Sequence, residues 1–519
     1  MRLELSVPGS VSPITPDFAS RLFAQDATLW GPDAESEATK RLAWTDLPSS
    51  SRPLIDIVAA LRADFNERGL THVVLCGMGG SSLAPEVICA AAGVPLTVLD
   101  SSHPDMVRNA LGHRLEESVV VVSSKSGGTV ETDSLLRAYV NAFERAGLEP
   151  ADHLVIVTDP GSPFDKDATA AGYLVIKADP DVGGRYSALS AFGLVPSGLA
   201  GADIGALLDG AARVRDAVAS DSPDNPAVRL GAALASAHSA GVDKLALRDA
   251  SGIGLGDWIE QLVAESTGKA GRGVVPVVVA PEHATSVSPS TADSFVVATG
   301  TTELPDASSG YAAAIEADLG AQFLLWEAAV AVAGAGIGIN PFDQPDVESA
   351  KQAARTFLTA SGTEVTPPDI QTDGISAYDT SARTLEAAVA DLLERLDPDH
   401  GYVAIQAYLD RLALPAYAKL RELLAERTKR PVTFGWGPRF LHSTGQLHKG
   451  GPATGVFLQL TDDPSHDLAV PGRDFTFGQF IAAQAAGDAQ VLEAHGRPLL
   501  RLHLADASAA LPRLTELFA

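Results

Sequence analysis

The segment Ser123–Thr132, with the sequence S-S-K-S-G-G-T-V-E-T, concentrates hydroxyls, glycines and a lysine in one short stretch. It follows the β-branched run Val119–Val122 and precedes an amphipathic segment. A strand, such a turn and a helix N-terminus together offer an anion several backbone N–H groups and side-chain hydroxyls. The segment is therefore a candidate phosphate-binding site, and the alternative is an ordinary loop between a strand and a helix.

Two later segments carry side chains that could act on a bound molecule. In Asp181–Pro196, Arg185 follows two glycines. Its permanent charge suits developing negative charge, although a surface arginine in a turn is the commoner case. In Asp257–Lys269, helical spacing places Gln261 and Glu265 on one face. Most helical glutamates are simply solvated, so Glu265 alone does not establish a site.

Two glycine-rich turns complete the set of candidates. Gly77–Ser82, G-M-G-G-S-S, lies between a strand pattern and a helix pattern and lacks the wider glycine spacing of dinucleotide-binding turns. Asp100 ends the next strand, so a nucleotide-binding site remains an alternative interpretation of this turn. Gly435–Gly451 contains His442 among turn-forming residues, where a histidine is usually just exposed.

The elements that must position these residues alternate between strand and helix. Short apolar strands that alternate with amphipathic helices predict a parallel sheet covered on both faces. Ligands of such sheets bind at the carboxyl ends of the strands, where both glycine-rich turns of this part lie. The expected strands are His72–Cys76, Leu96–Leu99, Val119–Ser123, His153–Thr158 and Tyr173–Ile176.

A second α/β unit is expected after the linker-like segment Ser220–Pro226. The predicted organisation is a peripheral lead-in over residues 1–51, a first subdomain over 52–218 and a second subdomain with a C-terminal extension over 227–519. The fold class is therefore α/β, with two doubly wound parallel-sheet subdomains and helical and C-terminal additions.

Composition limits the possible partners and location. The 519 residues carry a net charge of −27, which argues against nucleic acid and gives no reason to expect an anionic membrane. Two cysteines, Cys76 and Cys89, match no metal or redox spacing and predict buried thiols in a reducing compartment. Neither a signal peptide nor a membrane span is expected, so the predicted location is the cytoplasm.

Several of these segments together resemble signature blocks of the glucose-6-phosphate isomerase family. The resemblance spans about Leu54 to Gln459 and is closest to the actinobacterial type, which also occurs as the isomerase half of transaldolase–isomerase fusions. It implies two sugar-isomerase (SIS) subdomains with the substrate between them. The blocks are G-M-G-G-S-S, S-S-K-S-G-G-T-V-E-T, D-V-G-G-R-Y-S-A-L-S-A-F-G, E-S-T-G-K and N-P-F-D-Q-P-D-V-E-S-A-K, of which the arginine block is the most specific.

The resemblance also implies roles for individual residues. Glu265 would be the base that moves the proton, and Arg185 would lie near the reacting carbons. Lys351 and a histidine would assist ring opening. The substrate-binding residues implied are Gly80, Ser81, Ser124, Lys125, Ser126, Thr129, Gln261 and Gly184.

The histidine block departs from the family order. The family's ring-opening histidine lies between the glutamate and lysine blocks, whereas L-H-S-T-G-Q, with His442, follows both here. Sites are made by space and not by chain order, so His442 is the favoured candidate. His283 lies in the expected interval without the motif and is the competitor. Family members are usually dimers with a histidine crossing from the neighbour, so a homodimer is possible.

The expected activity is therefore interconversion of glucose 6-phosphate and fructose 6-phosphate through a cis-enediol, in glycolysis and gluconeogenesis. Neither a metal nor an organic cofactor is implied, and the partner is a small sugar phosphate. A phosphosugar isomerase that also takes mannose 6-phosphate is one alternative. A non-catalytic sugar-phosphate-binding protein is another, but it would not need Arg185, Glu265 and Lys351 together. A dehydrogenase would need the wider glycine spacing that Gly77–Ser82 lacks.

Overall fold

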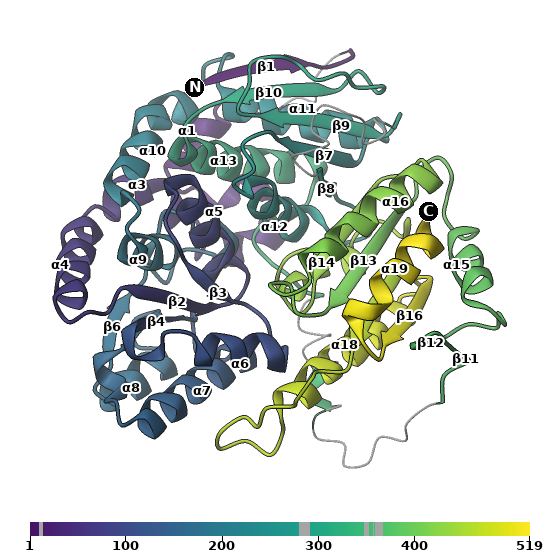
Figure 1. The fold of residues 1–519 in the computed structure, drawn as a ribbon. Helices are drawn as coiled ribbons and strands as arrows, with labels where there is room; N and C mark the ends of the chain where they lie inside the picture. Colours follow the sequence, from purple (N-terminus) through teal and green to yellow (C-terminus); the bar gives the residue numbers. More distant parts are fainter. Residues whose placement is uncertain (10–13, 280–290, 347–351, 357, 359–366) are drawn as a thin grey trace.

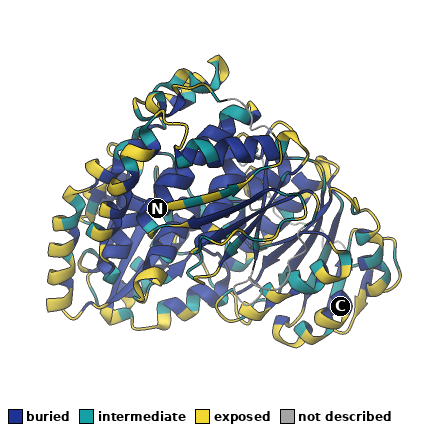
Figure 2. Cartoon of the chain, turned by 90° about the horizontal axis from the view of Figure 1, so that it is seen from above, coloured by how far each residue is buried: buried dark blue, intermediate teal, exposed yellow. Residues whose placement is uncertain are grey.

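Three β-sheets with flanking helices make up the computed structural model of the chain (Figure 1). The structure describes residues 1–9, 14–279, 291–346, 352–356, 358 and 367–519. Buried strands lie between helices whose outer faces are exposed, as Figure 2 shows. The mixed α/β class and the parallel sheets predicted from the strand–helix alternation are confirmed.

The first sheet has the order β3-β2-β4-β5-β6, and all its pairings are parallel. The chain runs from β2 outward to β3 and then returns to β4, so the order reverses between β2 and β4. A crevice forms at such a switch point, beyond the carboxyl ends of the two strands. Gly77 and Ser123, which end β2 and β4, are register partners, so the two predicted turns start side by side. The strands are β2 (His72–Gly77), β3 (Thr97–Leu99), β4 (Ser118–Ser123), β5 (Leu154–Thr158) and β6 (Leu174–Lys177).

The helices of this part are α4 (Pro53–Glu67), α5 (Leu83–Ala92), α6 (Pro104–Gly112), α7 (Val130–Ala146), α8 (Pro163–Ala170), α9 (Ala191–Ala200) and α10 (Ile204–Ala219). Two 3-10 turns, η3 (Gly79–Ser81) and η6 (Gly184–Tyr186), follow β2 and β6.

The second sheet has the order β1-β10-β9-β7-β8 and uses a strand from the N-terminal lead-in. β1 pairs antiparallel with β10, whereas the other pairings are parallel. The lead-in is therefore built into the sheet as its edge and is more than a peripheral segment. The elements are β1 (Arg2–Ser6), β7 (Lys244–Asp249), β8 (Val275–Val279), β9 (Ser294–Thr299), β10 (Ala312–Glu316), α1 (Phe18–Phe23), α2 (Pro32–Ala38), α3 (Leu47–Ser50), α11 (Pro226–Ser239), α12 (Leu255–Thr267) and α13 (Leu319–Ile337).

The C-terminal part forms a third sheet of its own, with the order β11-β12-β16-β15-β13-β14. Its four longer strands pair in parallel, and β12 and β11 add antiparallel edges. The sequence placed this part in a C-terminal extension of the second subdomain. Within the described residues its strands pair with one another and with no strand of the second sheet.

The strands of the third sheet are β11 (Ile370–Thr372), β12 (Ile375–Tyr378), β13 (Tyr402–Tyr408), β14 (Val432–Trp436), β15 (Gly455–Asp462) and β16 (Leu499–Leu504). Its helices are α15 (Leu385–Leu393), α16 (Leu420–Thr428), α17 (Gly445–Gly450), α18 (Phe477–Ala494) and α19 (Ala507–Phe518), with the 3-10 turn η9 (Arg439–His442) after β14.

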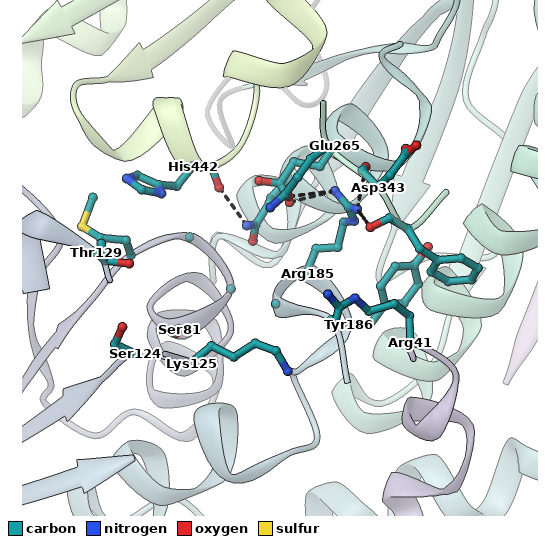
Figure 3. A pocket seen from close by; sticks show the side chains of 18 of the residues that line it. Arg41, Ser81, Ser124, Lys125, Thr129, Arg185, Tyr186, Glu265, Asp343 and His442 are labelled. Carbon is teal, nitrogen blue, oxygen red and sulfur yellow. Dashed lines mark hydrogen bonds and ion pairs between the residues drawn. The ribbon is translucent and has the colours of Figure 1, made fainter. Parts of the chain in front are cut away.

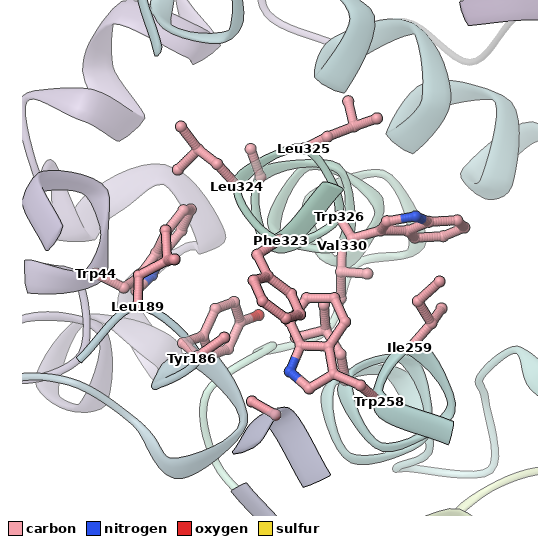
Figure 4. Packing of buried hydrophobic residues seen from close by; sticks show 14 of the residues in the cluster. Trp44, Tyr186, Leu189, Trp258, Ile259, Phe323, Leu324, Leu325, Trp326 and Val330 are labelled. Atoms are coloured by element: carbon pink, nitrogen blue, oxygen red, sulfur yellow. The ribbon is translucent and has the colours of Figure 1, made fainter. Parts of the chain in front are cut away.

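One continuous hydrophobic core joins the lead-in and the first two sheets. Helix α13 crosses this core beside α12 and the turn after Arg185, as Figure 4 shows. Trp44 of the lead-in stacks on Tyr186 with ring centroids 5.3 Å apart. Among the described residues, α13 is the one helix long and apolar enough to cross a membrane, and 89% of its apolar window is buried inside the protein. It is therefore packed as a core helix.

Candidate active site

A cavity of about 450 Å³ lies where the three sheets meet. Ser124 and Thr129 lie on one side of it, and Arg185 with Glu265 lies on the other (Figure 3). His442 reaches it from the third sheet. Of the residues implied by the resemblance, those that line the cavity are Gly80, Ser81, Ser124, Lys125, Thr129, Gly184, Arg185, Gln261, Glu265 and His442.

The predicted phosphate site occupies the turn between β4 and α7. Thr129 is the N-cap residue of α7, and its side chain makes no capping hydrogen bond. The Ser124 hydroxyl accepts a hydrogen bond from the backbone N–H of Gly127 at 3.1 Å. Ser126 is exposed and does not line the cavity. The turn therefore presents Ser124, Thr129 and the start of a helix to the cavity, which is a suitable environment for an anion.

Lys125 directs its ammonium group away from this anion site. Its Nζ donates to the carbonyl oxygens of Pro180 and Val182 at 2.7 and 2.9 Å, and it lies 2.9 Å from Asp159 Oδ2. These partners neutralise the charge and tie the phosphate turn to the segment before Arg185. The structure thus gives Lys125 a bridging position and leaves direct phosphate contact as a prediction.

Arg185 and Glu265 form a buried ion pair at the opposite side of the cavity. Arg185 Nη1 lies 3.1 Å from Glu265 Oε2, and the two residues are 4% and 6% exposed. Arg185 Nη2 donates to the carbonyl oxygens of Phe342 and Asp343 at 2.6 and 3.0 Å. The neighbouring residues also meet, because the Tyr186 hydroxyl lies 3.3 Å from Ser266 Oγ. Buried groups with this many partners are held in one geometry.

Lys269 supports the segment that holds Arg185. Its Nζ donates to the carbonyl oxygens of Asn340 and Asp343 at 2.7 and 2.6 Å, and to Asp343 Oδ1 at 2.8 Å. Burial, and then the nearby charge of Arg185, lowers the pKa of Lys269 to about 8. Lys269 ends the E-S-T-G-K block, but nothing in that block indicates this role.

The displaced histidine reaches the cavity, as the favoured interpretation required. His442 Nε2 lies 2.9 Å from Glu131 Oε1, in the first turn of α7. The His442 carbonyl oxygen accepts from Gln261 Nε2 at 2.8 Å, and Gln484 Nε2 donates to Glu131 Oε1 at 2.7 Å. The imidazole is thus held by a carboxylate that sequence reasoning did not single out, although Glu131 lies within the phosphate segment itself.

Glycines allow the turns around the cavity to approach each other. A Cβ on Gly80 would lie 1.9 Å from the carbonyl oxygen of Gly184, so η3 and η6 could not keep their contact with a larger residue. Gly79 has a φ of +55°, and a Cβ there would lie 2.6 Å from the His442 carbonyl oxygen. The glycines of G-M-G-G-S-S therefore serve close packing of three turns.

Two further candidates, Lys351 and His283, lie outside the described residues. The cavity instead includes Arg41, from the lead-in, whose Nε donates to Glu37 Oε1 at 2.8 Å. No sequence motif marked Arg41. It lies near the turns only because the lead-in packs across the first two sheets.

Comparison with known proteins identifies the central part of the chain. Residues 58–272 match the family model described as phosphoglucose isomerase. A glucose-6-phosphate isomerase of Thermosynechococcus vestitus is 39% identical over 216 residues, which cover 38% of this chain and 40% of that protein. A glucose-6-phosphate isomerase of Citrifermentans bemidjiense is 41% identical over 150 residues, covering 27% of this chain and 28% of that protein.

Residues 58–272 are therefore similar to the phosphoglucose isomerase family. The matched part spans less than half the length of these relatives. It contains the phosphate turn, Arg185 and Glu265, while His442 lies beyond it.

Solved structures show a similar fold over a larger part of the chain. The hypothetical protein TT0462 from Thermus thermophilus aligns with a TM-score of 0.54 and 24% identity, over 69% of this chain and 100% of that chain. A glucose-6-phosphate isomerase from Chlamydia trachomatis aligns with a TM-score of 0.52 and 20% identity, over 68% of this chain and 80% of that chain. The phosphoglucose isomerase fold is thus present in about two thirds of the chain.

Proposed function

We propose that this chain interconverts glucose 6-phosphate and fructose 6-phosphate through a cis-enediol intermediate. The observation that carries the proposal is the buried Arg185–Glu265 pair, which faces the Ser124–Thr129 turn across one cavity. Such an isomerase needs a base for a carbon-bound proton and a cation for the oxygen next to it. It also needs a binding site for the phosphate, which holds the reacting carbons of the sugar next to the base and the cation.

The phosphate turn supplies the anchor in this proposal. The phosphate binds at the N-terminus of α7, with the hydroxyls of Ser124 and Thr129 as additional donors. This end of the substrate takes no part in bond making. Its binding energy fixes the position of C1 and C2, which lowers the barrier by orienting the reacting atoms.

Glu265 and Arg185 carry out the proton transfer. The Glu265 carboxylate takes the proton from C2 of the open aldose and returns it to C1, so the same group serves both neighbouring carbons. The Arg185 guanidinium lies 3.1 Å from this carboxylate and is held in place by Phe342 and Asp343. It stabilises the negative charge that develops on the enediolate oxygen.

His442 is assigned to ring opening. The cyclic sugar must first exchange a proton between O1 and the ring oxygen, and an imidazole can perform that exchange. Glu131 holds Nε2 of His442, which orients the ring toward the cavity that contains Glu265. Lys351 remains its predicted partner. The proton moves between adjacent carbons of one molecule, so the proposed reaction has no requirement for a redox cofactor.

The decisive experiment is a coupled assay in which fructose 6-phosphate is supplied and glucose 6-phosphate is followed. We expect turnover by the purified full chain. Turnover of mannose 6-phosphate at a similar rate would replace the proposal with an isomerase of broader specificity. Binding of fructose 6-phosphate without turnover by folded protein would overturn it in favour of a sugar-phosphate-binding protein.

A further inference from the structure

A second cavity, of about 390 Å³, lies between the second and third sheets. Helix α12 borders both cavities, because Gln261 and Glu265 line the first while Asp257 and Glu260 line the second. The opposite wall comes from β14, at the edge of the third sheet. None of the residues assigned to the proposed isomerase reaction lines this second cavity.

Glu260 is a buried carboxylate that lacks a partner. The residue is 9% exposed, and within the described part of the chain its side chain makes neither a hydrogen bond nor an ion pair. Asp257, one turn earlier on the same helix, adds a second carboxylate that opens into the cavity. A buried carboxylate is costly when it is ionised without a partner, so a cation bound beside Glu260 would favour its ionised form. Burial and the charge of Asp257 raise the pKa of Glu260 to about 8.

The nearby arginines compensate these carboxylates only in part, because Arg421 and Arg439 lower the pKa of Glu260 by less than burial and Asp257 raise it. Arg411 lies 3.0 Å from both Glu86 and Asp100, and Arg439 pairs with the same two carboxylates. These two cations and two anions therefore balance one another. Arg421 also lines the cavity, but it forms no ion pair with either carboxylate of α12 in the described structure. Four carboxyl groups (Glu86, Asp249, Asp257 and Glu260) and three guanidinium groups (Arg411, Arg421 and Arg439) line the cavity, so its lining carries one net negative charge when Glu260 is ionised.

Two aromatic rings face the same space. Phe434 and Trp436 alternate along β14, so they lie on one side of the strand, and both are half-buried and line the cavity. Their ring centroids are 4.8 Å apart at an interplanar angle of 76°. Aromatic rings beside carboxylates form the environment in which proteins hold organic cations.

We propose that the second cavity binds a small organic cation, with its ammonium group between Asp257 and Glu260 and its apolar part against Phe434 and Trp436. A metal ion is the less suitable occupant, because no group of three or more His, Cys, Asp or Glu side chains among the described residues could hold one. An organic cation can interact with the carboxylates of α12 and with the rings of β14 at the same time. It neutralises the unpaired carboxylate and covers the half-buried rings.

Benzylamine tests the proposal on the full chain, with benzyl alcohol as its uncharged match. In isothermal titration calorimetry at pH 8, we expect one benzylamine bound per chain and benzyl alcohol bound at least about tenfold more weakly. Glu260→Gln and Asp257→Asn should each weaken benzylamine binding by about tenfold or more. Glu303→Gln, an exposed acid elsewhere in the chain, is the matched control and should bind as the parent does.

The affinity for benzylamine should also rise with pH between about 6.5 and 8.5. The affinity rises because Glu260 must be ionised to hold the cation. The charged groups nearest to it are Asp257 on α12, Arg421 on α16 and Arg439 on η9, and Glu86 and Arg411 line the same cavity.

Equal binding of amine and alcohol, no binding at all, or unchanged binding by both acid variants would each overturn the proposal. Because binding is measured without sugar phosphate, the result is independent of the proposed isomerase activity. The exposed position of Asp257 makes Asp257→Asn informative if Glu260→Gln fails to fold.

Discussion

Arg185 lies in η6, after the last strand of the first sheet, and Glu265 lies in α12, after the strand β7 of the second sheet. The two residues meet only in the folded chain. Each is buried, and the residues that follow them, Tyr186 and Ser266, meet through their hydroxyl groups at 3.3 Å. An ion pair built in this way is rigid before substrate arrives. Preorganised charge of this kind is what stabilises a transition state most effectively.

Glu265→Gln removes the proposed base and retains the shape of the side chain. We expect kcat to fall by about 10²–10⁴-fold, because that is the usual contribution of a positioned base. Binding of fructose 6-phosphate should persist, since its phosphate site is distant on the other side of the cavity. Kinetics and calorimetry on the same preparation separate the two effects. Asp257→Asn, on the same helix, serves as the control, and wild-type turnover by Glu265→Gln would exclude this residue as the base.

Glu131 acts through His442, so the two should behave as one unit. We expect His442→Asn to lower kcat by about 10²-fold and Glu131→Gln to lower it less, because glutamine still accepts a hydrogen bond. The double variant should be about as impaired as His442→Asn alone, a non-additive result in a double-mutant cycle. Losses that simply add would show that Glu131 acts on something other than the imidazole.

Glu260 makes stability depend on pH. Its pKa is about 8 in the folded chain, whereas the ordinary value for a glutamate, which applies to the unfolded chain, is 4.5. Between these two values the folded state keeps a proton that the unfolded state has lost. The free energy of unfolding therefore falls as pH rises through this window, by at most about 1.4 kcal/mol per pH unit. Glu260→Gln lacks this titration.

We therefore expect Glu260→Gln to gain stability relative to the parent as pH rises from about 5 to 8, with no further gain above that. Urea unfolding at several pH values measures the difference, and Glu303→Gln should follow the parent throughout. A constant difference between Glu260→Gln and the parent would mean that Glu260 titrates in its ordinary range.

At the residue scale, the sequence pointed to residues whose own segment carries a signal. A strand–turn–helix pattern or a motif surrounds Ser124, Thr129, Arg185 and Glu265, and all four line the cavity. No role was predicted for Glu131, because its role depends on contact with His442, which lies 311 positions later in the chain. The ammonium group of Lys125 was expected beside the phosphate, but it binds Asp159 and the carbonyl groups of Pro180 and Val182 instead. The sequence around Lys125 does not indicate these partners.

At the scale of elements, the site depends on the contact between the turns η3 and η6. Gly80 and Gly184 pack so closely there that a Cβ on Gly80 would lie 1.9 Å from backbone. The Ser187 hydroxyl lies at the same contact, 2.6 Å from the Gly184 carbonyl oxygen and 3.3 Å from the Gly80 carbonyl oxygen. These turns carry Ser81 and Arg185, so their separation sets the width of the cavity.

Gly80→Ala should force η3 and η6 apart. We expect the midpoint of thermal unfolding to fall, with a loss of about 1–3 kcal/mol as for other overpacked sites, and KM for fructose 6-phosphate to rise. Gly112→Ala is the matched control, because a Cβ there meets nothing within 4 Å. Unchanged kinetics in a folded Gly80→Ala protein would show that the width of the cavity at this point is unimportant for substrate.

Elements were predictable from periodicity, but their assignment to sheets was not. β2, β3, β4, β5 and β6 were each expected as strands, since short apolar runs are local signals. Which strands pair is decided by contacts between distant segments, and a parallel strand has the same pattern in any sheet. β1 shows the same limit, because nothing within Arg2–Ser6 indicates its partner Ala312–Glu316.

At the scale of the whole molecule, the described lining of the proposed active site comes from one chain. The lead-in supplies Arg41, the first sheet supplies the phosphate turn, the second supplies Glu265 and the third supplies His442. The resemblance to the family implied that the histidine could cross from a neighbouring subunit. Here the third sheet brings His442 to the cavity of its own chain.

Activity per chain should therefore be independent of oligomeric state. We expect specific activity to stay constant over about a thousand-fold dilution, because His442 lines the cavity of its own chain. Sedimentation at the same concentrations reports whether the chain associates. A loss of activity that follows dissociation of a dimer would show that a partner subunit completes the site.

The position of His442 also has a consequence for synthesis of the protein. The chain emerges from the ribosome N-terminus first, at roughly 5–20 residues per second, and domains fold as they appear. The phosphate turn, Arg185, Glu265 and the Phe342 and Asp343 carbonyl groups that hold Arg185 are all made roughly 5–20 seconds before His442. A nascent or prematurely terminated chain would thus capture a sugar phosphate while lacking the group that opens its ring. Truncated products would compete for the metabolite instead of converting it.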